Sequence, residues 1–149
     1  MKALASVLVV LTVMISFSAH AKVIAEVVVS GGFMSPDVCG SHQVTIDDTG
    51  LVQFQACVAK PLKLAMLSAK VVAKLVKKID ALQISELRRP NQLGCVDAPS
   101  THYSVAQKGG EMKAIAAREN CVDLEMTNSN YQVRDVRDLL KGFLALSDF

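Results

Sequence analysis

Few side chains in this chain have the types and spacing that catalysis needs. Ser100, His102 and Asp97 include the residue types of a nucleophilic triad. They lie in one short segment, whereas such triads normally draw on separate segments, so we interpret His102 as a surface histidine on a strand. The G-x-S-x-G and H-E-x-x-H patterns of serine hydrolases and zinc peptidases are absent. We therefore predict that the protein is not an enzyme.

An acidic pair and a glycine pair also have structural explanations. Asp47 and Asp48 lie directly before Thr49 and Gly50, where the side chain–backbone hydrogen bonds of a turn account for paired carboxylates. The pair Gly31-Gly32 follows a β-branched run but lacks the remaining residues of a phosphate-binding loop. We expect no nucleotide and no other cofactor.

The cysteines are the strongest chemical signal in the chain. They are Cys39, Cys57, Cys95 and Cys121. An even number of cysteines in a short exported chain indicates disulfides, and four cysteines allow three connectivities. Zinc is the competing explanation, but there is no C-x-x-C pair, and His42 and His102 lack ligand spacing. We therefore favour two disulfides and expect no metal.

The N-terminus has the three regions of a secretory signal peptide. Lys2 supplies a positive charge, an apolar run of about fifteen residues follows, and Ala19-His20-Ala21 forms an A-x-A cleavage site. The run is shorter than the about 20 residues of a membrane-spanning helix. We expect residues 1–21 to be removed after Ala21. Residues 22–149 would then form one domain in the periplasm or outside the cell, with no integral membrane span.

Alternating apolar residues predict strands at the start of that domain. Lys22–Ser30 is a β-branched run, and His42–Asp47 and Leu51–Val58 alternate around a turn, which indicates a β-hairpin. Pro61 should break the last strand, and Ser68 is a suitable N-cap for an amphipathic helix. The apolar stripe of that helix is Val72, Leu75, Val76, Ile79 and Leu82.

The second half repeats this order. Thr101–Gln107 and Glu111–Ala117 alternate around Gly109-Gly110, which suits a tight hairpin turn. A polar stretch follows, and then a second amphipathic helix with Asn130 as its candidate cap. The predicted fold class is α+β, an antiparallel sheet built from hairpins with two amphipathic helices packed on one face. The expected core is Val27, Val29, Val44, Ile46, Val52, Phe54, Val72, Leu75, Val76, Ile79, Val105, Val136, Leu140 and Phe143.

The cysteine positions agree with these hairpins. Cys39 and Cys57 fall almost opposite each other about the first turn, and Cys95 and Cys121 fall roughly opposite about the second. Opposite strands place two Cα atoms at the distance of about 4.4–6.8 Å that a disulfide needs. We favour the pairs Cys39–Cys57 and Cys95–Cys121, and the crossed pairings remain open.

Charge is distributed unevenly, although the net charge is only +2. Residues 60–89 are strongly basic, and Lys70, Lys74 and Lys77 lie on the polar side of the first predicted helix. This basic face is either the solvated side of an amphipathic helix or an attractive surface for an acidic partner or an anionic membrane. The small net charge and the 5% aromatic content argue against a nucleic acid partner.

The loop of residues 31–40 contains large apolar side chains next to a glycine pair. A strand at one end and a cysteine near the other would hold the loop, so that it loses little entropy on binding. Phe33 either fills a pocket of a partner or folds back over the sheet. The candidate contact residues for a protein partner are Gly31, Gly32, Phe33 and Met34.

A family resemblance covers most of residues 22–149. The segment 26–33, Glu-Val-Val-Val-Ser-Gly-Gly-Phe, resembles the opening strand and turn of emfourin, a small protein inhibitor of thermolysin-like metalloproteases. Leu75–Ile79 resembles the inhibitor's central helix. Asp97, the run Tyr103–Ala106 and Gly109-Gly110 resemble its Asp, Tyr and Gly-Gly hairpin. The chain also resembles uncharacterised exported bacterial domains with the same hairpin–helix order. It differs from emfourin in its four cysteines, its signal peptide and an insertion around residues 121–130.

The resemblance implies a binding protein that blocks a metalloprotease, and we take Phe33 as its anchor. The alternative is an exported, envelope-associated domain that binds a partner through Lys70, Lys74 and Lys77. Salt-sensitive association would favour the alternative, because exposed charges attract each other less as ionic strength rises.

Overall fold

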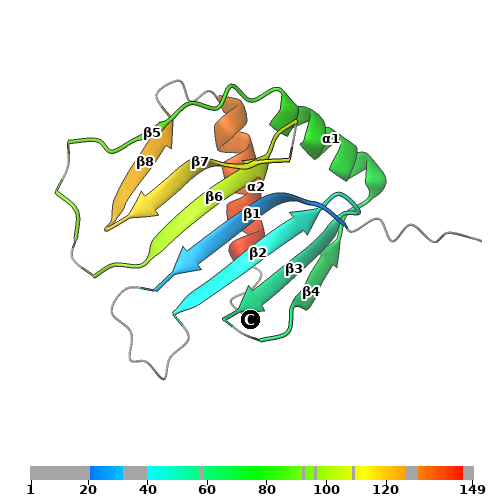
Figure 1. The fold of residues 1–149 in the computed structure, drawn as a ribbon, viewed down its shortest axis with the longest axis horizontal. Coiled ribbons are helices and arrows are strands. Elements are labelled where there is room, and N and C mark those ends of the chain that lie inside the picture. Colours follow the sequence, from blue (N-terminus) through cyan, green and yellow to red (C-terminus); the bar gives the residue numbers. More distant parts are fainter. Residues whose placement is uncertain are drawn as a thin grey trace, which may run out of the picture.

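The computed structural model describes residues 21–31, 40–57, 59–91, 93–95, 97–108, 110–126 and 131–145. These residues form one antiparallel sheet and two helices (Figure 1). The strands are β1 (Val23–Ser30), β2 (Ser41–Asp47), β3 (Leu51–Ala56), β4 (Leu62–Met66), β5 (Leu87–Arg88), β6 (Ser100–Ala106), β7 (Met112–Glu119) and β8 (Val122–Met126). The helices are α1 (Ala69–Asp80) and α2 (Tyr131–Ala145). The predicted α+β class is confirmed.

The strand order is β4-β3-β2-β1-β6-β7-β8-β5, so β1 and β6 lie at the centre of the sheet. Val27 of β1 lies opposite Val44 of β2 on one side and Tyr103 of β6 on the other. These three side chains are buried, which places a row of the core across the central strands. The first hairpin pairs as the alternation predicts, with Val44 opposite Phe54 of β3.

The turn between β2 and β3 depends on Asp47. Its Oδ1 accepts hydrogen bonds from the Thr49 amide at 2.9 Å, the Thr49 hydroxyl at 2.6 Å and the Leu51 amide at 3.0 Å. Gly50 has φ +91°, a left-handed conformation that glycine adopts without strain. The interpretation of the acidic pair as a turn is therefore confirmed for Asp47.

Both helices bury apolar residues in the same hydrophobic cluster as the sheet. The Ser68 side chain accepts a hydrogen bond from the Val71 amide at 3.4 Å, which confirms the predicted N-cap of α1. In Figure 1, α2 crosses behind the central strands and α1 lies at the upper right end of the sheet. The candidate cap Asn130 lies outside the described residues. No helix within the described ranges is long and apolar enough to span a membrane.

The observed core agrees with most of the predicted one. Ten of its residues are buried, while Phe54, Val76 and Phe143 are partly buried and pack against the cluster. Val29 is a wrong prediction, since it is only half-buried and lies outside the cluster. It is the second-last residue of β1, where the sheet ends. Buried apolar residues that the prediction omitted are Ile24, Ala25, Leu82, Tyr103, Ile115, Ala116, Ala117, Val122, Leu124, Met126 and Val133.

Three strands were not predicted from the sequence. β4 follows Pro61 directly and pairs with β3. The preceding proline does not prevent this pairing, because proline is tolerated at the start of an edge strand. β8 occupies part of the stretch read as polar, and its alternating residues Val122, Leu124 and Met126 are buried. The two-residue strand β5 pairs with β8 and is too short to leave a periodic signal.

Candidate functional site

The base of the loop 31–40 is narrow. β1 ends at Ser30 and β2 begins at Ser41, and these two residues lie opposite each other. Gly31 follows Ser30, and Gly40 precedes Ser41. A Cβ added at Gly31 would lie 2.6 Å from the carbonyl oxygen of Gly40, which no real side chain allows. The two backbones are therefore in contact, and position 31 requires glycine. The other candidate contact residues, Gly32, Phe33 and Met34, lie outside the described residues.

Cys57 lies directly beside this loop base. Its amide donates a hydrogen bond to the Ser41 carbonyl oxygen at 3.0 Å, one residue from Gly40. Cys57 is disulfide-bonded, and its expected partner Cys39 lies outside the described residues. A covalent link is thus attached to the residue directly after β3, next to the start of β2, the strand that leads out of the loop.

The pair Cys95–Cys121 is confirmed as a disulfide, with a Cα–Cα distance of 5.6 Å. Cys121 belongs to the two-residue turn between β7 and β8, in which Asn120 and Cys121 have φ +49° and +65°. Two positive φ values are typical of tight hairpin turns. The Cys95 amide also donates to the Asn120 carbonyl oxygen at 2.7 Å. The segment before β6 is therefore bound to the β7–β8 turn.

The loop base, Cys57 and the Cys95–Cys121 pair lie at the same end of the sheet, which we call the disulfide end. The strand pairing places them together, because Ser30 is opposite Ser41 on one side and Ser100 on the other. Three serines from three strands thus form one row across this end. Figure 1 shows that β1 ends, and β2 and β6 begin, at this end of the sheet.

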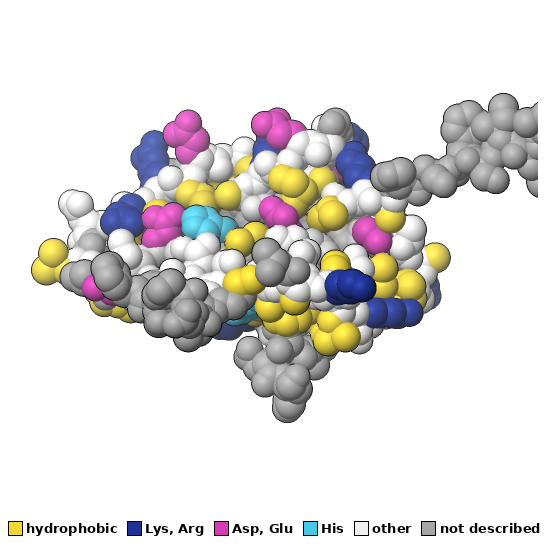
Figure 2. Space-filling view, turned by 60° about the horizontal axis from the view of Figure 1, so that its bottom comes forward, with side chains coloured by type: hydrophobic (Ala, Val, Ile, Leu, Met, Phe, Trp, Pro, Cys, Tyr) yellow, Lys and Arg dark blue, Asp and Glu magenta, His cyan; other side chains and the backbone are white. Residues whose placement is uncertain are grey.

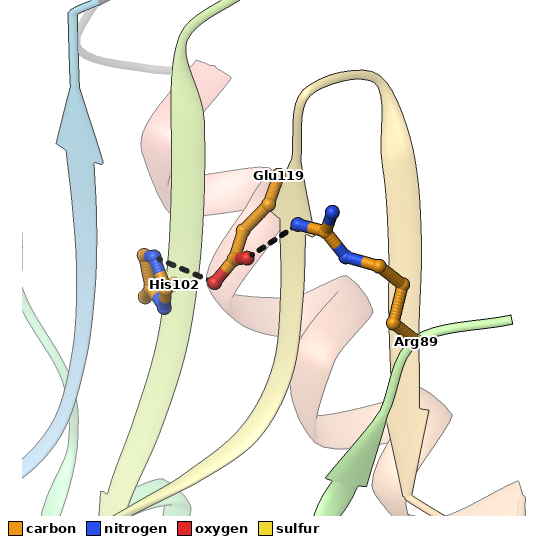
Figure 3. A network of polar contacts seen from close by, with 3 residues as sticks. All are labelled: Arg89, His102 and Glu119. Atoms are coloured by element: carbon orange, nitrogen blue, oxygen red, sulfur yellow. Dashed lines mark hydrogen bonds and ion pairs between the residues drawn. The ribbon is translucent and has the colours of Figure 1, made fainter. Parts of the chain in front are cut away.

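A polar network lies next to the serine row. His102 Nε2 is 3.6 Å from Glu119 Oε1, and Arg89 Nη2 is 3.1 Å from Glu119 Oε2. Figure 3 shows the three side chains in front of the strands, with α2 behind them. All three side chains are between about one third and one half exposed, so the network is a surface feature. It joins the segment after β5 to β6 and β7.

His102 has the surroundings of a surface histidine, as the sequence indicates. Its recorded ion pair is with Glu119 rather than with Asp97. Within the described residues no hydrogen bond connects Ser100 to His102, although both belong to β6 and their side chains alternate to the same side. The geometry therefore does not assemble a Ser–His–Asp arrangement. Among all the residues that the structure describes, no group of three His, Cys, Asp or Glu side chains could hold a metal ion.

Most positions of β1, β2, β3 and β6 that alternate with the core are polar and half-exposed, and we call these polar positions the polar face. They include Glu26 and Ser30 of β1, Gln43 and Thr45 of β2, Gln53 and Gln55 of β3, and His102 and Ser104 of β6. Figure 2 shows acidic, basic and histidine side chains next to one another, with hydrophobic and other uncharged groups between them. Near the disulfide end, a shallow depression of about 110 Å³ is lined by Val28, Ser41, His42, Gln43, Gln55 and Cys57.

The basic residues predicted on the first helix lie where the periodicity places them. Lys70, Lys74 and Lys77 are exposed on α1, away from its buried residues. Lys78 differs from them, because its Nζ lies 2.7 Å from Asp135 Oδ2 and joins α1 to α2. The exposed lysines lie on α1, away from the loop base at the disulfide end, so the chain has two separate candidate surfaces.

Comparison with known proteins adds no relative. No family model matches the chain, and neither do the curated proteins or the solved structures that were searched. The candidate surfaces therefore have to be interpreted from their own geometry.

Proposed function

We propose that this chain is an exported, disulfide-stabilised binding protein that presents the loop of residues 31–40 to a protein partner. The single observation that carries the proposal is the contact between Gly31 and Gly40, with the disulfide-bonded Cys57 beside it. A loop held at a narrow, covalently secured base loses less conformational entropy when a partner binds. The chain contributes no catalytic group to this function.

The proposal includes export and removal of residues 1–21. The backbone nitrogen of Lys22 lies 3.0 Å from Asp48 Oδ1, and the Asp48 amide donates to the Lys22 carbonyl oxygen at 2.9 Å. Cleavage after Ala21 would turn that nitrogen into an ammonium group beside a carboxylate. The new N-terminus is thus accommodated by the turn before β3, and residues 22–149 form the mature domain in the periplasm or the medium.

The proposal also places both helices on one side of the sheet. The buried residues of α1 and α2 share one cluster with the buried residues of β1, β2 and β6. The polar face is then free on the opposite side and ends at the loop base. A partner that binds the loop would rest on the serine row and on the Arg89–Glu119–His102 network.

The partner class that we propose is a thermolysin-like metalloprotease, with Phe33 as the anchor residue. This part rests on the resemblance of residues 26–33 to emfourin. An apolar side chain next to two glycines can enter a cleft with little steric obstruction, and such central aromatic anchors often carry most of the binding energy of an interface. The alternative is a partner bound by Lys70, Lys74 and Lys77 on α1.

The test is a titration of protease activity with residues 22–149. We expect the wild-type domain to inhibit a thermolysin-like metalloprotease, and Phe33→Ala to weaken inhibition at least about tenfold, as for a hot-spot aromatic. Leu62→Ala is the matched control, because Leu62 is an exposed apolar residue of the edge strand β4. The control should inhibit like the wild type.

A triple variant separates the two surfaces. Lys70→Glu, Lys74→Glu and Lys77→Glu together should leave protease inhibition unchanged if the loop binds the enzyme. Absence of inhibition by the wild type, or equal inhibition by Phe33→Ala, would refute the loop proposal. Loss of inhibition in the triple variant alone, with strong salt dependence, would assign binding to α1 instead.

A further inference from the structure

A second cavity lies on the other side of the sheet, between α2 and strands β6 to β8. Its volume is about 330 Å³, within the range of about 300–1,000 Å³ that is usual for small-molecule sites. Tyr103 and Ala116, which lie opposite each other in the β6–β7 register, belong to its lining. The short side chain of Ala116 leaves room that a larger residue would fill. Leu124 and Leu144 add apolar surface.

Three basic side chains line this cavity from two elements. Arg118 comes from β7, whereas Arg137 and Lys141 come from successive turns of α2. Arg118 is 3.9 Å from Asp123, and Arg137 is 3.1 Å from Asp138. Lys141 is exposed and forms no recorded ion pair with another described residue. Among the described residues, these three cations and two carboxylates together leave a net charge of about +1 at the cavity.

Tyr103 adds a polar group to the apolar part of the cavity. Its side chain is 9% exposed. Burial raises the pKa of Tyr103 above its ordinary value, and the nearby carboxylates Asp123 and Asp138 act in the same direction against Arg137 and Arg118. The phenol therefore stays protonated at neutral pH and remains a hydrogen-bond donor.

We propose that this cavity binds a small carboxylate with an apolar body. The small positive excess suits a monoanion better than a doubly charged phosphate, because Asp123 lies in the same lining. Guanidinium groups pair well with carboxylates, and the apolar half of the lining would cover the body of the ligand. The volume of about 330 Å³ lies at the lower end of the usual range for small-molecule sites, so the ligand should be small. The site is independent of the loop 31–40 and of the proposed inhibition.

The experiment is an NMR titration of residues 22–149 with octanoate, a small carboxylate with an apolar body. We expect saturable shifts of the Thr101, Tyr103 and Lys141 amides, weaker binding at higher ionic strength, and no such shifts with octylammonium. A second arm uses acetyl-Ala-Leu with a free or an amidated C-terminus. If acetyl-Ala-Leu binds only with a free C-terminus, and binds more tightly than octanoate, a peptide C-terminus is the better source of the carboxylate.

The test uses variants of exposed residues, so that a loss of binding does not reflect a loss of folding. Lys141→Gln and Arg118→Gln should each raise the dissociation constant of the better carboxylate at least about fivefold, since each removes one cation next to the anion. Lys70→Gln is the control on α1 and should bind like the wild type. An unchanged dissociation constant in both cavity variants, or no saturable shift with either carboxylate, would overturn the proposal.

Discussion

Asp47 shows how one side chain organises a turn. Among the described residues it is the only buried charged side chain, and its Oδ1 receives three hydrogen bonds from Thr49 and Leu51. Hydrogen bonds to a charged acceptor are worth more than neutral ones, and donors that lose such a partner must be solvated again. The β2–β3 turn should therefore be sensitive to this position.

We expect Asp47→Ala to lower the free energy of unfolding by about 2–3 kcal/mol. Asp47→Asn should cost less, because the amide keeps an oxygen acceptor for the same donors. Asp48→Ala, which removes an exposed partner of Lys22, should cost under about 1 kcal/mol. Urea unfolding followed by circular dichroism measures all three variants. Equal losses for Asp47→Ala and Asp47→Asn would contradict the role assigned to the oxygen.

At the scale of elements, α1 depends on a residue outside the helix. Gln107, just after β6, donates from Nε2 to the Leu82 carbonyl oxygen at 2.7 Å and to the Ile79 carbonyl oxygen at 3.3 Å. The last carbonyl groups of a helix have no partner within the helix. The Gln107 side chain thus adds donors at the C-terminal end of α1, beside the backbone bonds from the Ala81 and Leu82 amides, and joins this end to the end of β6.

Replacing Gln107 by alanine should destabilise the domain by about 1–2 kcal/mol, because the part-buried Leu82 carbonyl group loses its donor and the Ile79 carbonyl group keeps only its bond from the Leu82 amide. Gln55→Ala is the matched control, since Gln55 lies half-exposed on the polar face. Its cost should stay within about 0.5 kcal/mol. Thermal unfolding of both variants compares them directly. Similar losses in the two variants would show that the cap contributes no specific stability.

The helices and strands also show which elements can be predicted from periodicity in the sequence. The stripe Val72, Leu75 and Ile79 predicted α1, and alternation predicted the pairing of β2 with β3. β8 was missed although Val122, Leu124 and Met126 alternate, because acidic residues separate them and the run is short. Pro61 predicts a break after β3, but a proline can also precede an edge strand, and β4 begins at the next residue.

At the scale of the whole molecule, the Cys95–Cys121 bridge connects distant parts of the sheet. It joins the segment between β5 and β6 to the β7–β8 turn, across a sequence separation of 26 residues. Arg89 and Glu119 form an ion pair across the same two regions. That pair is half-exposed and contributes little by itself, so the covalent link is the main constraint on this segment.

The double variant Cys95→Ser and Cys121→Ser should lose about 3 kcal/mol of unfolding free energy, by the chain entropy of the loop that the bridge closes. The measurement is urea unfolding under non-reducing conditions. Adding a reductant to the wild type should produce at least the same loss, because it also reduces the bond at Cys57. A double variant as stable as the oxidised wild type would rule out this stabilising role.

The sequence by itself determined the local elements and their buried sides. Helical and strand periodicity depend on neighbouring residues, so α1, α2 and the β2–β3 hairpin were readable. Hairpin geometry favoured the Cys95–Cys121 pair but left the crossed pairings open. Only the tertiary structure decided what meets across the sheet. The Arg89–Glu119–His102 network and the cavity beneath α2 combine residues that are far apart in the chain, and the strand order brings them together. The contact of Gly31 with Gly40 likewise depends on how β1 and β2 pair. The distance between two backbone segments cannot be predicted from the residues around either glycine.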